Sequence, residues 1–131
     1  MTIEEFVQRE ASLPPYPGAC CRMVDRWLVE RCGFSALARF GRDFDTDDDV
    51  ARWLAEPGGI AVAVNRVMRA AGFKKTKEPL AGDVGLVFRG PLLCMSIHAG
   101  KQWVSRDESG LVGLPLAHVW KAWSLMHAGR D

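Results

Sequence analysis

The sequence changes character at Glu78-Pro79. Before this point, apolar residues recur at helical spacing, and after it they gather in short β-prone runs separated by turn residues. The first pattern predicts amphipathic helices and the second predicts strands. Helices first and strands second, with hairpin-length connections, predict an α+β fold with an antiparallel sheet. We therefore expect N-terminal helices packed on a small antiparallel β-sheet.

The helical half carries its own start and stop signals. Thr2 and Glu5 form a capping-box pattern, and Thr46 is an N-cap before acidic residues. Gly33 is a suitable C-terminal stop. A loop with three prolines, residues 13–18, leads into the second helix and cannot be regular structure, because proline fixes φ and lacks a donor. The expected helices span about 3–10, 20–32, 47–54 and 60–71.

The second half predicts short strands over 83–88, 92–98, 103–104 and 111–114. The turn cluster Arg106-Asp107-Glu108-Ser109-Gly110 separates the last two. A final helix is expected from Ala117 to about Met126. The basic run Lys74–Lys77 is interpreted as a solvated loop, because it is too short to predict nucleic-acid binding.

Composition and length narrow the class of protein. The 131 residues suit one domain, 1–131, and a hydrophobic fraction of 48% is enough for a core. A net charge of +1 predicts neither a nucleic-acid surface nor a polybasic membrane surface. No apolar run approaches the ~20 residues of a transmembrane helix, and the acidic N-terminus lacks the apolar region of a signal peptide. We expect synthesis in a cytoplasm, with reduced thiols.

Cys20 is the main candidate for chemistry. It opens the predicted second helix, where free N–H groups and the helix dipole favour a thiolate. The apolar stripe of that helix includes Cys20, so the residue is predicted to face the core, with Cys21 on the flank. The competing interpretation is a small buried core residue, because free cysteine is among the most buried types.

Other candidate sites are weaker. His98 is the one histidine in the strand region and a candidate base, or else a hydrogen-bonded histidine at a strand end; His118 and His127 are interpreted as surface or packing residues. The cysteines lack the C-x₂-C spacing of metal sites, so we expect no metal and no cofactor. The acidic run 45–49 is better explained as a helix start than as a cation site. A thiolate cluster, the remaining alternative, would use Cys20, Cys21, Cys32 and Cys94.

Several segments together resemble a known superfamily. They are residues 19–24, residues 81–87 with Gly82-Asp83-Val84, residues 95–97 with Gly100, and residues 110–116 followed by Trp120 or Trp123. This ordered set, spanning roughly 14–125, resembles the NlpC/P60 superfamily. These are papain-like cysteine peptidases that cut peptidoglycan stem peptides. The similarity is closest to small members encoded in phage tail and prophage clusters.

The resemblance places Cys20 at the nucleophile position. At the other catalytic positions, this sequence differs from the family's usual residues. Ala19 stands where the family usually has aspartate, and Cys94 aligns with the general-base histidine. His98 cannot take that place, because residues i and i+4 of a strand lie ~13 Å apart. The third catalytic position falls near Val104 or Ser105. Cys20 and Cys94 become expected neighbours, which leaves a redox-sensitive pair as an alternative.

The resemblance therefore implies a degenerate NlpC/P60-like protein of a phage or prophage tail tip or tail assembly. Its partners would be other tail or baseplate proteins, and it would be made in the bacterial cytoplasm and incorporated into the virion. The alternative is an active peptidoglycan-cleaving cysteine endopeptidase that aids genome entry. In that case Cys20 attacks, His98 or another group acts as the base, and peptidoglycan is the substrate.

Overall fold

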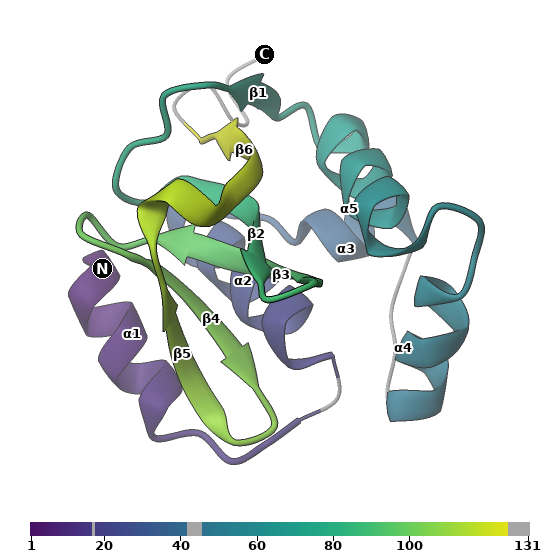
Figure 1. Cartoon of the computed structure of the whole chain (residues 1–131), viewed down its shortest axis with the longest axis horizontal. Helices are drawn as coiled ribbons and strands as arrows, with labels where there is room; N and C mark the ends of the chain where they lie inside the picture. Colours follow the sequence, from purple (N-terminus) through teal and green to yellow (C-terminus); the bar gives the residue numbers. More distant parts are fainter. Residues whose placement is uncertain (17, 42–45, 126–131) are drawn as a thin grey trace.

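The computed structural model describes residues 1–16, 18–41 and 46–125, and within them the fold is α+β, as expected (Figure 1). Helices occupy the first half of the chain and strands the second. The helices are α1 (Ile3–Ala11), α2 (Ala19–Cys32), α3 (Ala36–Phe40), α4 (Asp47–Leu54) and α5 (Gly59–Ala70). The strands are β1 (Lys74–Thr76), β2 (Val84–Arg89), β3 (Leu92–His98), β4 (Trp103–Asp107), β5 (Gly110–Leu114) and β6 (Val119–Ser124), with a short 3₁₀ helix, η1 (Leu116–His118), before β6.

The predicted helix signals are confirmed. The Thr2 hydroxyl accepts a 3.1 Å hydrogen bond from the Glu5 N–H, and the Glu5 carboxylate bonds back to the Thr2 N–H. Thr46 caps α4, and Gly33 ends α2 with φ 83°, a conformation that glycine adopts without strain. The short helix α3 was not predicted, although Ser35 caps it through the Ala38 N–H.

The strands form one antiparallel sheet in the order β1-β6-β2-β3-β4-β5. Helix α2 packs across β3 and β4, and α1 lies beside β5 (Figure 1). Pairing between β3 and β4 is short, with only Ile97↔Val104 and His98↔Trp103 in register. The two strands therefore part beside the start of α2, which positions the candidate site.

Two expectations about the second half were wrong. The predicted helix from Ala117 is η1 followed by strand β6, as far as the described residues extend, and Met126 lies outside them. The segment pairs with β2 on one side and β1 on the other, so ladder hydrogen bonds to a buried central strand outweigh local helical preference. Lys74–Thr76, expected as a loop, is edge strand β1. Lysines on such an edge discourage pairing with other chains.

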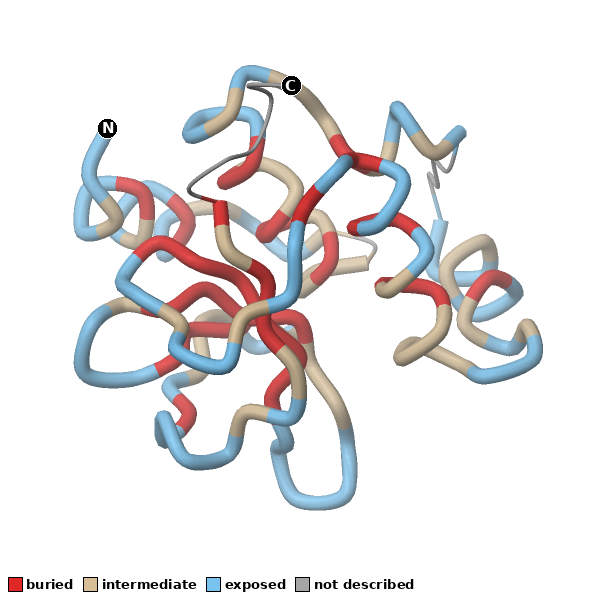
Figure 2. The backbone as a smooth tube through the Cα atoms, turned by 90° about the horizontal axis from the view of Figure 1, so that it is seen from above, coloured by how far each residue is buried: buried red, intermediate tan, exposed pale blue. Residues whose placement is uncertain are grey.

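The sheet is covered by a core on each face. The larger one lies between the helices and the sheet and contains Phe6, Trp27 and Met95, whereas the smaller one on the opposite face contains Val87 and Trp103. The central strands are buried and the outer turns exposed (Figure 2). No helix in the described ranges is long and apolar enough to cross a membrane.

Candidate functional site

Cys20 and Cys21 lie in the first turn of α2, but their orientation differs from the prediction. Cys21 is only 8% exposed, whereas Cys20 is half-buried at the edge of the core. Residues of α3, α4 and α5 surround Cys21, so this position on the flank is buried. Cys21 lines a small apolar pocket there of about 30 Å³, together with Val24, Leu28, Trp53, Val67, Met68 and Met95.

The sulfur of Cys20 is surrounded by hydrogen-bond donors. A hydrogen bond from the Cys21 thiol lowers the pKa of Cys20 to about 7, against the opposing effect of burial, and the Met95 N–H and the N–H groups of Cys20 and Cys21 add to the lowering. The same hydrogen bond raises the pKa of Cys21. These donors stabilise the thiolate form of Cys20 at the helix N-terminus. The expected thiolate-favouring environment is therefore present.

Cys94 is the cysteine that the sheet brings to Cys20. It directly precedes Met95 in β3. The N–H of Met95 donates a hydrogen bond to the Cys20 sulfur. Burial raises the pKa of Cys94, the negative charge of Cys20 raises it further, and a hydrogen bond with the Ser105 side chain lowers it. Ser105 also donates a 2.8 Å hydrogen bond to the Met95 carbonyl, across the gap where β3 and β4 part. Cys20, Cys94 and Ser105 thus meet in one place.

His98 has other partners. Its Nδ1 accepts a 3.1 Å hydrogen bond from the Gly100 N–H, and its ring lies edge-on to Trp103 with centroids 5.0 Å apart. Burial lowers the pKa of His98, with the Asp83 charge acting in the opposite direction. The structure does not join His98 to Cys20. His118 is exposed in η1, and His127 lies outside the described residues.

The four cysteines do not converge as a cluster. Cys32 ends α2, about 18 Å along the helix from Cys20 at ~1.5 Å per residue. Within the described ranges, no three His, Cys, Asp or Glu residues are placed to hold a metal ion. Asp47, Asp48 and Asp49 form the first turn of α4, as the sequence predicted, and Asp45 lies outside the described residues.

The Gly82-Asp83 motif has a structural role. The indole N–H of Trp27 in α2 donates a 2.7 Å hydrogen bond to the Gly82 carbonyl. The buried Asp83 carboxylate accepts N–H bonds from Leu80 at 2.8 Å and Leu125 at 3.0 Å. The motif therefore joins the helix that carries Cys20 to the start of β2 and the end of β6.

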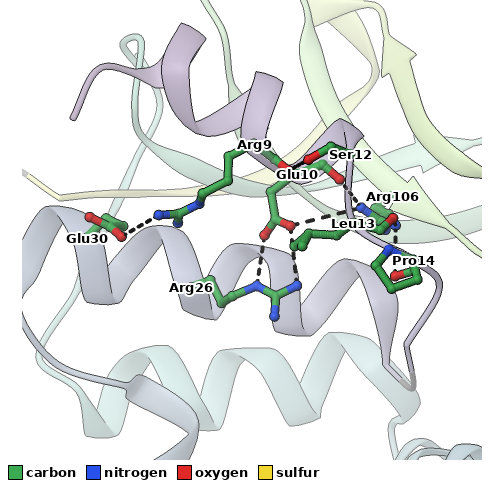
Figure 3. A network of polar contacts seen from close by, with 8 residues as sticks. All are labelled: Arg9, Glu10, Ser12, Leu13, Pro14, Arg26, Glu30 and Arg106. Carbon is green, nitrogen blue, oxygen red and sulfur yellow. Dashed lines mark hydrogen bonds and ion pairs between the residues drawn. The ribbon is translucent and has the colours of Figure 1, made fainter.

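Sequence reasoning missed a buried ion network that holds the chain entering α2 (Figure 3). Glu10 is fully buried, and its carboxylate accepts a 2.9 Å hydrogen bond from Arg26. Arg106 faces the same carboxylate at 4.0 Å and also donates to the backbone carbonyls of Glu10, Leu13 and Pro14. The available sequence signal is Glu10, which continues the inward spacing of Ile3, Phe6 and Val7. Arg106 was expected in the turn cluster, but it lies in β4.

Tyr16 completes the support of this loop. The Arg26 guanidinium lies 4.2 Å from its ring centroid and that of Arg106 lies 4.9 Å away. Both distances suit cation–π contacts. The proline-containing segment before Cys20 is thus held by two arginines from different elements.

The arrangement favours chemistry of the thiol rather than base-assisted hydrolysis. A thiolate at neutral pH is a nucleophile by itself. Peptide cleavage also needs a group that protonates the leaving amine, for which papain-like enzymes use imidazole. Among the described residues, the neighbours of the Cys20 sulfur are thiols and backbone N–H groups.

The chain belongs to the family described as a domain of unknown function, DUF6950, which matches residues 2–125. No curated protein and no solved structure matches it.

Proposed function

We propose that this protein is a degenerate NlpC/P60-like domain that serves as a structural component of a phage or prophage tail tip or tail assembly. One observation carries the loss of catalysis: the residue beside Cys20 is Cys94, where the resembled family has its histidine. The phage tail setting comes from the sequence resemblance.

A Cys94 thiol does not replace an imidazole. Its pKa is raised, so near neutral pH it holds its proton and cannot accept one from an attacking thiol. Ser105, at the third position of the resembled site, donates its hydroxyl proton to the Met95 carbonyl instead of orienting a ring. In this proposal, the site keeps the helix and strand of the resembled family and lacks its proton-transfer group.

The surface suits a docking role. Several large apolar side chains are exposed near the β2–β3 turn and along β6, and such groups mark protein contacts when they gather. Leu92 is 66% exposed and Trp120 is 44% exposed. Phe88 and Leu116 are also exposed. These side chains would face neighbouring tail or baseplate subunits.

The test is association. The protein should co-purify stoichiometrically with tail or baseplate proteins of its own gene cluster when they are co-expressed, and should be detected in purified particles. Trp120→Ala should weaken the association while the thermal unfolding temperature stays unchanged, and Val29→Ala, at an exposed position on α2, serves as the matched control. A monomer that binds none of them and is missing from particles contradicts the proposal.

The alternative is an active peptidoglycan endopeptidase, favoured by the pKa of Cys20 near 7. In that case, purified peptidoglycan should release new amino termini. Cys20→Ala should abolish the release, and Cys32→Ala, at the other end of α2, should not. Hydrolysis that depends on Cys20 would overturn the structural proposal, whereas no hydrolysis by the wild-type protein would eliminate the enzyme.

A further inference from the structure

We propose that Cys20 and Cys94 form a reactive dithiol, which exchanges with low-molecular-weight disulfides and closes into a Cys20–Cys94 disulfide. This inference concerns a modification of the chain itself. It is independent of the proposed role in a phage tail.

The backbone places the two residues together. The nitrogen of Met95, which donates to the Cys20 sulfur, is two covalent bonds from the Cα of Cys94. Helix α2 packs against β3, so both cysteines lie in regular secondary structure. Both cysteines are free and half-buried, so a small disulfide can reach the site. The Cys20 sulfur therefore lies beside the backbone of Cys94, and its charge acts on the Cys94 thiol, as expected for two cysteines that can be bridged.

The other described cysteines are poor partners. Cys21 follows Cys20 directly, so their Cα atoms lie about 3.8 Å apart, closer than the about 4.4–6.8 Å of ordinary disulfides. Cys21 is also buried in the apolar pocket. Cys32 lies at the opposite end of α2. Cys94 is therefore the cysteine available to resolve a mixed disulfide on Cys20.

The exchange proceeds in two steps. The Cys20 thiolate attacks one sulfur of a small disulfide, the S–S bond of that molecule breaks, and one thiolate leaves. Cys94 then loses its proton to solvent or to the departed thiolate, and its sulfur attacks Cys20. The second small thiol leaves, so two protein thiols are oxidised and one external disulfide is reduced to two thiols.

The charge of the Cys20 thiolate determines which of the two cysteines attacks first. The Cys20 charge is one cause of the raised pKa of Cys94, so Cys94 is a weak nucleophile while Cys20 is a thiolate. In the mixed disulfide, the Cys20 sulfur carries no charge, so it no longer raises the pKa of Cys94. Deprotonation of Cys94 then becomes easier when its attack is required.

The experiment treats the reduced full-length protein with oxidised glutathione at pH 7.5 and analyses it by mass spectrometry before and after digestion. The wild-type protein should lose two thiols, and the peptides that contain Cys20 and Cys94 should be found joined. Cys94→Ser should stop at a glutathione adduct on Cys20. Cys20→Ser should lose the fast reaction, with the rate reduced at least tenfold.

Cys32→Ser is the matched control and should close the same disulfide at the wild-type rate. Circular dichroism of each reduced variant confirms that it is folded. Four unmodified thiols in the wild-type protein would overturn the proposal. Pairing of Cys20 with a cysteine other than Cys94, or an adduct that persists on wild-type Cys20, would overturn it as well.

Discussion

Arg106 on β4 donates a 2.6 Å hydrogen bond to the carbonyl oxygen of Leu13, a residue 93 positions earlier in the chain. The same guanidinium faces the fully buried carboxylate of Glu10 (Figure 3). One strand residue thus holds both the end of α1 and the loop that leads to Cys20.

We predict that Arg106→Met strongly destabilises the protein. The buried Glu10 carboxylate loses one of its two cationic neighbours and three backbone carbonyls lose a donor. Removing one partner of a buried ion pair costs about 3–5 kcal/mol. Urea denaturation, followed by circular dichroism, measures the change. Arg9→Met is the control, because the Arg9–Glu30 pair is partly exposed and is worth about 1 kcal/mol or less. Equal losses in the two variants would contradict this account.

Ser105→Ala should destabilise the protein by about 1–3 kcal/mol, because the buried Met95 carbonyl loses its hydroxyl donor. The free energy of unfolding in urea is the measurement. Ser109→Ala, in the exposed turn between β4 and β5, should change it by no more than about 0.5 kcal/mol. A neutral Ser105→Ala would mean that the gap between β3 and β4 does not need this bridge.

Trp27→Phe should cost about 1–3 kcal/mol, because the buried Gly82 carbonyl loses its indole donor while most of the ring packing is kept. Thermal and urea unfolding test this. The control is Trp120→Phe, at an exposed position of β6, which should be close to neutral. If the two variants behave alike, the Trp27–Gly82 bond does not contribute to joining α2 to the sheet.

The alkylation rates of Cys20 and Cys32, at the two ends of α2, should depend differently on pH. Because the pKa of Cys20 is about 7 rather than the ordinary 9.0, its iodoacetamide alkylation rate should rise with a midpoint near pH 7. Burial raises the pKa of Cys32, so its rate should rise only above pH 9.0. Peptide mapping after timed alkylation separates the two. In urea the two midpoints should converge. A Cys20 midpoint near pH 9 in the folded protein would contradict the lowered pKa of Cys20.

Local signals in the sequence predicted much of the fold. The Thr2 and Thr46 caps and the Gly33 stop act through hydrogen bonds and backbone conformations within a few residues, so they can be recognised without tertiary information. The hairpins of β2–β3 and β4–β5 are local in the same sense. The sequence resemblance also led us to expect Cys20 and Cys94 as neighbours, and in the structure the negative charge of Cys20 acts on the Cys94 thiol.

Long-range packing decided the rest. The segment after Ala117 forms β6 because it pairs with β1 on one side and β2 on the other. These partners are distant in the chain, so no local sequence pattern indicates them. Cys21 is buried because residues of α3, α4 and α5 surround it. The reach of Arg106 to Leu13 joins distant parts of the chain. The sequence by itself determined the helix caps, the glycine stop and the two hairpins, because these depend on residues close together in the chain. Only the tertiary structure decided which cysteine is buried and which groups surround Cys20, because those depend on contacts between elements.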